Sequence, residues 1–306
     1  MKSKFTGALI GSAVGDALGA PVEGYGMKKV SSVYGADWKM SSGRYTDDTE
    51  MMIGVAESLI ENKGFNGADM ALKFIENYDM RRGYGPGSKE ALRRIREGES
   101  WGEASKKLFG GKGSYGNGAA MRIAPVGLFY YDDTEKLREI AFKSSHITHS
   151  HELGKEGAAL QAFSIAFAVR GQKEDMLLEL KEFVENEVYV EKIRKIEVLL
   201  DKEADKKEII SELGNGEEAF NSVPTAIYSF LRADSFKDAV VYAVSLGGDT
   251  DTIGAMTGAI SGAYYGEGVI PKEWVEKLEE GGKGRRYIRR LGEELHRVKF
   301  VYNLKG

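Results

Sequence analysis

The chain has 306 residues, 42% of them hydrophobic and 29% charged, so it can bury a sizeable core and is too apolar for a disordered protein. Lysine plus arginine number 43 and aspartate plus glutamate 47, which leaves no positive excess to attract nucleic acid. Cysteine is absent, which excludes disulfides, zinc–thiolate sites and thiol nucleophiles and favours a reducing compartment, expected to be the cytoplasm.

The N-terminal segment from Phe5 to Val22 is apolar and rich in glycine. A signal peptide or a membrane span has to be considered for such a segment. Asp16 interrupts it, however, and a span needs about 20 uninterrupted apolar residues. We therefore expect a buried core helix and no membrane partner.

Helical periodicity dominates the rest of the chain. Apolar residues recur at spacings of three and four, as in Met51, Val55 and Leu59, whereas alternating strand patterns are few and short. No linker of low complexity divides the sequence, so we predict an all-α fold, a single compact helical domain over residues 1–306. Residues 174–213 combine many Lys and Glu with apolar residues at helical spacing, which predicts amphipathic surface helices.

Glycines recur every four residues near both ends of the chain, at Gly7, Gly11, Gly15 and Gly19 and again at Gly254, Gly258 and Gly262. Each glycine inside a helix costs about 1 kcal/mol relative to alanine, so the two stripes need an offsetting contact. Small residues at this spacing let helix backbones approach closely. We expect the two helices to cross near the centre of the fold, although each stripe packing against an unrelated neighbour is the alternative.

The first acidic motif runs from Arg44 to Glu50 and stands directly before the predicted helix at Met51–Ile60. Thr46 or an adjacent aspartate can cap that helix. Capping explains one acid, but Asp47 and Asp48 point about 100° apart on a helix. Adjacent carboxylates with a hydroxyl are also what Mg²⁺ or Mn²⁺ prefers.

The second acidic motif, Gly247 to Thr252, also opens a helix. In an extended loop Asp249 and Asp251 would face the same side, and the two preceding glycines allow a tight turn. Four carboxylates in one place would repel one another unless cations neutralised them. Together the two motifs predict an oxygen-ligand site for one or two metal ions.

Four segments of the chain, taken in order, resemble the successive signatures of the ADP-ribosylglycohydrolase family, which includes the dinitrogenase-reductase-activating glycohydrolase. The last is the most specific, and the resemblance extends from about Phe5 to Tyr265. The segments are Gly11–Glu23, Thr46–Thr49, Gly116–Arg122 and Gly247–Gly254.

The resemblance implies an all-helical hydrolase with two divalent cations, Mg²⁺ or Mn²⁺, acting on an ADP-ribosylated protein or a small ADP-ribosyl substrate. The positions that match the family's metal ligands are Thr46, Asp47, Asp48, Asp249, Asp251 and Thr252. Those that match its substrate-binding positions are Gly116, Asn117, Gly118, Ala119 and Met121 along the diphosphate and His149 in the ADP-ribose cleft. Glu23 matches a glutamate beside the metals and the distal ribose. Glu50 departs from the glutamine of many relatives but lies outside the ligand positions.

Other polar segments have less specific interpretations. The glycine-rich loop Gly110–Gly118 is either a flexible connection or a phosphate cradle. Three of the four histidines lie within residues 146–151; zinc is one interpretation, although no His-Glu-x-x-His pattern supports it, and an ordinary polar cleft or helix end is the other. Arginines in 81–96 and 285–290 are expected on solvated basic faces, and the Gly83–Gly87 loop could border the acceptor.

The predicted reaction is attack of water on the anomeric carbon of the distal ribose, through an oxocarbenium-like transition state. Glu23 or a metal-site aspartate such as Asp48 is the candidate acid or base. Two other interpretations remain open at this point. One is a non-catalytic relative that binds ADP-ribose, and the other is a metal-dependent nucleotide phosphohydrolase.

Overall fold

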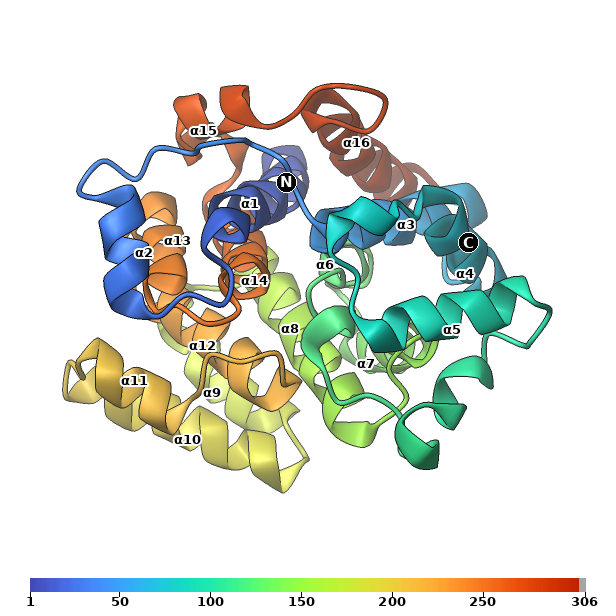
Figure 1. Cartoon of the computed structure of the whole chain (residues 1–306), viewed down its shortest axis with the longest axis horizontal. Coiled ribbons are helices and arrows are strands. Elements are labelled where there is room, and N and C mark those ends of the chain that lie inside the picture. The colour runs from blue at the N-terminus through green and yellow to red at the C-terminus, as the bar shows by residue number, and fades with distance from the viewer. Residues whose placement is uncertain (303–306) are drawn as a thin grey trace.

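The computed structural model describes residues 1–302, so the last four residues of the predicted 1–306 unit lie outside it. The all-α prediction is confirmed: sixteen α-helices and short 3₁₀ segments make up the described part, which contains no strand (Figure 1). The helices are α1 (Lys2–Gly19), α2 (Met27–Tyr34), α3 (Asp47–Asn62), α4 (Gly67–Asn77), α5 (Pro86–Arg96), α6 (Ala124–Phe129), α7 (Thr134–His146), α8 (Glu152–Arg170), α9 (Met176–Phe183), α10 (Glu187–Asp201), α11 (Lys206–Glu212), α12 (Ala219–Arg232), α13 (Phe236–Ser245), α14 (Thr250–Tyr265), α15 (Lys272–Lys277) and α16 (Arg285–Tyr302).

The two glycine-striped helices, α1 and α14, pack directly against each other at the centre of the molecule. Their backbones touch so closely that a Cβ atom on Gly15 would lie 2.0 Å from the carbonyl oxygen of Gly254. Gly7 meets Gly262 in the same way, and Gly19 meets Thr250. The pairs run in opposite directions along the chain, so the helices are antiparallel. The predicted contact is therefore confirmed, and it places the end of α1 beside the start of α14.

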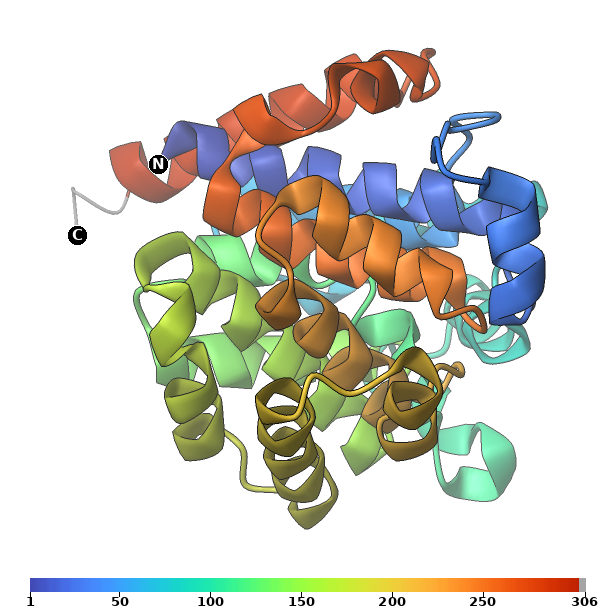
Figure 2. The ribbon, with the colours of Figure 1, turned by 90° about the vertical axis from the view of Figure 1, so that its left-hand side faces the viewer.

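Helix α1 is the one helix of the described residues that is long and apolar enough to be considered as a membrane span, over Lys2–Val22. Within the fold, 89% of that window is buried. Helices α15 and α16 cover one side of α1, as Figure 2 shows. The segment therefore lies where a core helix is expected, including the fully buried Asp16.

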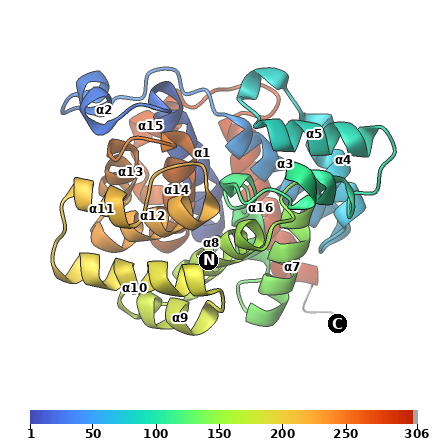
Figure 3. The same cartoon turned by 60° about the horizontal axis from the view of Figure 1, so that its bottom comes forward.

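The remaining helices surround this central pair. Helices α8, α12 and α13 pack on α14, and α3 packs on α1. The predicted surface segment 174–213 forms α9, α10 and α11, which lie along one edge of the molecule, remote from α1 (Figure 3). Their apolar residues at helical spacing, such as Ile193 and Ile196, face the core while the intervening charges face solvent.

Candidate active site

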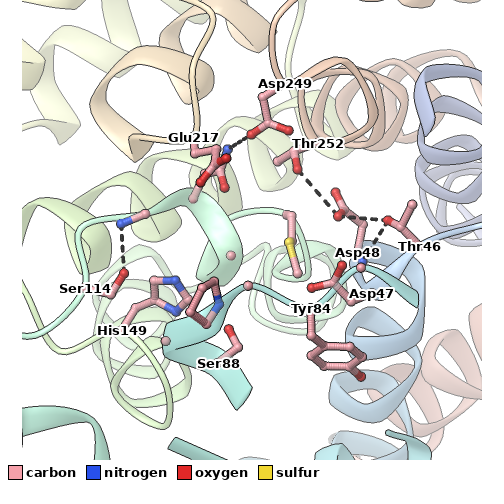
Figure 4. A pocket seen from close by; sticks show the side chains of 18 of the residues that line it. Thr46, Asp47, Asp48, Tyr84, Ser88, Ser114, His149, Glu217, Asp249 and Thr252 are labelled. Carbon is pink, nitrogen blue, oxygen red and sulfur yellow. Dashed lines mark hydrogen bonds between the residues drawn. The ribbon is translucent and has the colours of Figure 1, made fainter. Parts of the chain in front are cut away.

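A cavity of about 320 Å³ opens where the ends of α1, α3 and α14 converge. Residues from distant parts of the chain line it, and Figure 4 shows the first acidic motif facing Asp249 and Thr252 across it. Of the predicted site residues, those that line the cavity are Glu23, Thr46, Asp47, Asp48, Gly116, Asn117, Gly118, Met121, His149, Asp249, Asp251 and Thr252.

The first acidic motif is fixed by its position at the start of α3. Thr46 is the N-cap residue, and its hydroxyl accepts a hydrogen bond from the backbone N–H of Asp48 at 3.3 Å. The same hydroxyl donates to the Asp48 carboxylate at 3.1 Å. Capping therefore accounts for Thr46, whereas the Asp48 carboxylate is 2% exposed and serves no cap.

Asp16 holds the backbone of the first acidic motif in place, a role that was not predicted from the sequence. Its carboxylate accepts hydrogen bonds from the backbone N–H groups of Thr46, at 2.9 and 3.0 Å, and of Thr49, at 3.1 Å. The hydroxyl of Thr49 adds a fourth bond at 2.6 Å. The sequence did contain a sign of this role, because Asp16 is a lone carboxylate in an apolar helix. A fully buried carboxylate needs several hydrogen-bond donors.

The second acidic motif begins α14. Gly247 and Gly248 adopt φ values of 72° and 76°, a conformation that favours glycine, and they turn the chain into the helix. Asp249 is the N-cap residue and Asp251 lies in the first turn. Helix geometry, rather than the strand-like alternation of an extended loop, therefore sets the directions of the two side chains. The Thr250 hydroxyl donates to the Gly19 carbonyl at 2.9 Å, which ties this turn to α1.

The two motifs meet. The Thr252 hydroxyl donates to the Asp48 carboxylate at 3.5 Å. Carboxylate oxygens of Glu23, Asp249 and Asp251 all lie within 4.8 Å of one another, a group that could hold a metal ion.

The negative charge of this cluster is incompletely compensated by the protein. One carboxylate oxygen of Asp48 and one of Asp251 are buried without a hydrogen-bond partner. Burial, followed by repulsion from neighbouring carboxylates, raises the pKa of Asp47 to about 8 and the pKa of Asp48 and Asp251 well above the ordinary range. Unpaired, buried carboxylate oxygens next to threonine hydroxyls are a donor set that fits hard divalent cations.

The glycine-rich segment Gly116–Met121 forms one wall of the cavity. The Asn117 side-chain amide donates to the Asp249 carboxylate at 2.5 Å and to the Ser222 hydroxyl at 3.0 Å. Ala119 is the exception among the predicted residues. Its side chain is fully buried in the hydrophobic core and does not line the cavity, because the turn at Asn117–Ala119 points it inward.

The three neighbouring histidines do not converge on a common point. His149 lines the cavity, while His151 caps α8 by accepting from the Leu153 N–H at 3.1 Å. His146 makes a hydrogen bond of 3.0 Å to the Gly102 carbonyl oxygen. Within residues 1–302 the only cluster with ligand-like spacing is the acidic one, so these contacts favour the polar-cleft and helix-end interpretation over zinc.

The Gly83–Gly87 loop borders the cavity, as the sequence suggested, and brings Tyr84 with it. The Tyr84 hydroxyl donates to Glu50 at 2.8 Å. Arg82 is not on a solvated basic face, contrary to expectation: its guanidinium donates to the Tyr45 carbonyl at 2.7 Å and to Glu279 at 2.5 Å. These two acceptors explain its inward position.

Two further cavity residues, Tyr84 and Glu217, carried no recognisable pattern in the sequence. Each lies in a loop whose position depends on tertiary packing, and single polar residues in loops are too common to be diagnostic.

The fold and this cavity together define an all-helical protein with an acid-lined site that could hold metal ions. A family model described as ADP-ribosylglycohydrolase matches residues 1–303. ADP-ribosylhydrolase ARH3 of Mus musculus is 35% identical, with 97% of this chain and 92% of that protein covered. A protein of Archaeoglobus fulgidus is 34% identical, with 97% of both chains covered.

Among solved structures, one described as an ADP-ribosylglycohydrolase-related protein complex superposes with a TM-score of 0.77 at 28% identity, covering 98% of this chain and 99% of that chain. The chain belongs to the ADP-ribosylglycohydrolase family. It is a hydrolase of glycosyl bonds to ADP-ribose.

Proposed function

We propose that the protein is a metal-dependent hydrolase that cleaves the bond between ADP-ribose and a protein side chain or small acceptor. The observation that carries this proposal is the acidic cluster, in which Glu23, Asp249 and Asp251 converge in a cavity and Asp48 and Asp251 each keep a buried, unpaired oxygen. The proposed ligands of two Mg²⁺ or Mn²⁺ ions are Thr46, Asp47, Asp48, Asp249, Asp251 and Thr252. Bound there, the cations would supply Lewis-acid charge stabilisation and orient the ribose hydroxyls.

The cavity has room for an elongated substrate. A second cavity, of about 480 Å³, adjoins the first and shares Phe109, Ser114, Gly116 and Glu217 with it. Tyr115 lines the second cavity and is 48% exposed. Acids at one end and aromatic rings along the other suit a ligand with polar sugar hydroxyls at one end and a flat base at the other.

Glu23 is the proposed acid or base. Loss of hydration against the cavity wall raises its pKa, and the charges of Asp249 and Glu217 raise it further. A carboxyl group with a raised pKa can donate a proton to the leaving acceptor as the glycosidic bond breaks, and then accept one from the attacking water. The remaining carboxylates of the cluster would stabilise positive charge at the anomeric carbon.

The test is release of ADP-ribose from ADP-ribosyl-serine and ADP-ribosyl-arginine peptides, in Mn²⁺ or Mg²⁺ and in EDTA, with the product identified by mass. We expect metal-dependent release of intact ADP-ribose, reduced at least about 100-fold in Asp48→Asn. Asp133→Asn is the matched control, because Asp133 caps the exposed start of α7 and asparagine caps equally well.

Other outcomes distinguish the alternatives. AMP as the product would establish a phosphohydrolase, and tight binding of ADP-ribose without turnover of either peptide or of an O-acetyl ester would favour a binding protein.

A further inference from the structure

Arg122 is a fully buried arginine that the proposed chemistry leaves without a role. It follows the Asn117–Ala119 turn and is 0% exposed. No carboxylate of the described residues lies within ion-pair distance of it. Its guanidinium lies over the Phe74 ring at 4.6 Å, donates to the Ser144 carbonyl at 3.2 Å and donates to the Thr148 hydroxyl at 2.8 Å.

Thr148 links Arg122 to His149, which lines the cavity. Its hydroxyl oxygen lies 2.8 Å from Nδ1 of His149, and Thr148 is itself fully buried. Arginine has donors only, so the hydroxyl must accept from Arg122 and keeps its single proton for another partner. Among the described residues that partner is Nδ1 of His149.

The opposite arrangement is unfavourable. If Nδ1 carried a proton and donated to Thr148, the hydroxyl oxygen would accept twice and its own proton would be buried without an acceptor. A buried donor without a partner loses its full hydration. The network therefore makes Nδ1 an acceptor, and a neutral imidazole then carries its proton on Nε2.

The surroundings keep the ring neutral. Burial, helped by the positive charge of Arg122, lowers the pKa of His149 to about 3. Nε2 has no hydrogen-bond partner within the described part of the chain. It faces the glycine wall of the cavity, where a Cβ atom on Gly118 would lie 3.0 Å away and one on Gly116 3.5 Å away.

We infer that Arg122 and Thr148 are positioning residues that fix His149 in one tautomer, so that its Nε2–H is a permanent donor to an anionic oxygen of the substrate, such as a diphosphate oxygen. Protons are not transferred in this role. The ring acts as a neutral donor that cannot switch to an acceptor and therefore discriminates against ligands with a donor at this point. The nature of the ligand rests on the proposed function, whereas the tautomer does not.

The first test needs no substrate. Nitrogen-15 NMR of the histidine rings, with His149→Phe to assign the signal, should show one neutral tautomer of His149, protonated on Nε2, across pH 6–8. In Arg122→Met no guanidinium donates to the Thr148 hydroxyl, so that oxygen is free to accept from Nδ1–H of His149 and both His149 tautomers should appear. Protonation on Nδ1 in the wild type would overturn the inference, as would an unchanged single tautomer in Arg122→Met.

The second test measures the dissociation constant of ADP-ribose by calorimetry. Thr148→Val and His149→Phe should each weaken binding about 10-fold, the effect of losing one charge-assisted hydrogen bond. Thr148→Ser, which keeps the hydroxyl, should stay within about twofold of the wild type. In the double variant Thr148→Val/His149→Phe the two losses of affinity should not add, because both substitutions act on the same hydrogen-bond donor. Additive losses would mean that Thr148 has a merely structural role and would overturn the inference.

The two proposals can fail separately. If the wild type shows the Nε2–H tautomer and Arg122→Met disturbs it, but ADP-ribose does not bind, the positioning network is supported and the proposed function is contradicted.

Discussion

Gly15→Ala should destabilise the protein, although alanine is the better helix former. The new Cβ atom would lie 2.0 Å from the Gly254 carbonyl oxygen, whereas ordinary contact begins at 3.4 Å, so the helices must separate locally by about 1.4 Å. Overpacking of this kind costs about 3 kcal/mol, more than the gain of about 1 kcal/mol in helix propensity. We expect the free energy of unfolding to fall by about 2 kcal/mol or more, measured by urea denaturation.

The matched control is Gly268→Ala. A Cβ atom there meets nothing within 4 Å, and we expect a change within about 0.5 kcal/mol. Gly15 also lies next to Asp16, which holds the first acidic motif, so displacement of about 1 Å should reduce hydrolysis by about 100-fold. A Gly15→Ala variant as stable as Gly268→Ala would refute the close antiparallel contact of α1 and α14.

Three further predictions concern the buried acids. In EDTA, burial raises the pKa of Asp16 to about 6 and that of Asp47 to about 8, from the ordinary value of 3.8. The folded state then holds more protons than the unfolded state, so the free energy of unfolding should fall between pH 6 and pH 8. Urea denaturation at both pH values checks this, and equal stability contradicts it. Glu50→Gln should change stability by less than about 1 kcal/mol and leave turnover unchanged, because the amide oxygen can still accept from Tyr84; a large loss of turnover would place Glu50 in the site. Asp16→Asn puts an amide donor against the N–H of Thr46 and should weaken Mn²⁺ binding at least about 10-fold by calorimetry; unchanged affinity would contradict its role.

The fold class and the meeting of the acidic motifs could be predicted from the sequence because both depend on regular spacing. Glycines every four residues have a physical reason only if backbones touch. That contact, together with the hydrogen bonds between Asp16 and the start of α3, brings Asp48 near Thr252. The positions of Asp249 and Asp251 were harder to predict from the sequence. The exact residue at which a helix begins depends on local capping and, here, on the hydrogen bond between Thr250 and the Gly19 carbonyl.

The supporting residues were missed for a different reason. Tyr84, Glu217 and the inward position of Arg82 depend on contacts between loops and helices far apart in sequence. Asp16 could have been recognised, because a carboxylate inside an apolar helix must find donors. Ala119 was placed along the substrate by motif position, but the turn directs its side chain into the core.

The central claim is that two motifs about 200 residues apart form one cation site. Calorimetric titration of the metal-free protein with Mn²⁺, comparing Asp48→Asn, Asp251→Asn and the control Asp133→Asn, tests it most directly. The account predicts that both site variants lose the same binding event while the control retains it. Wild-type affinity and stoichiometry in either Asp48→Asn or Asp251→Asn would contradict the account.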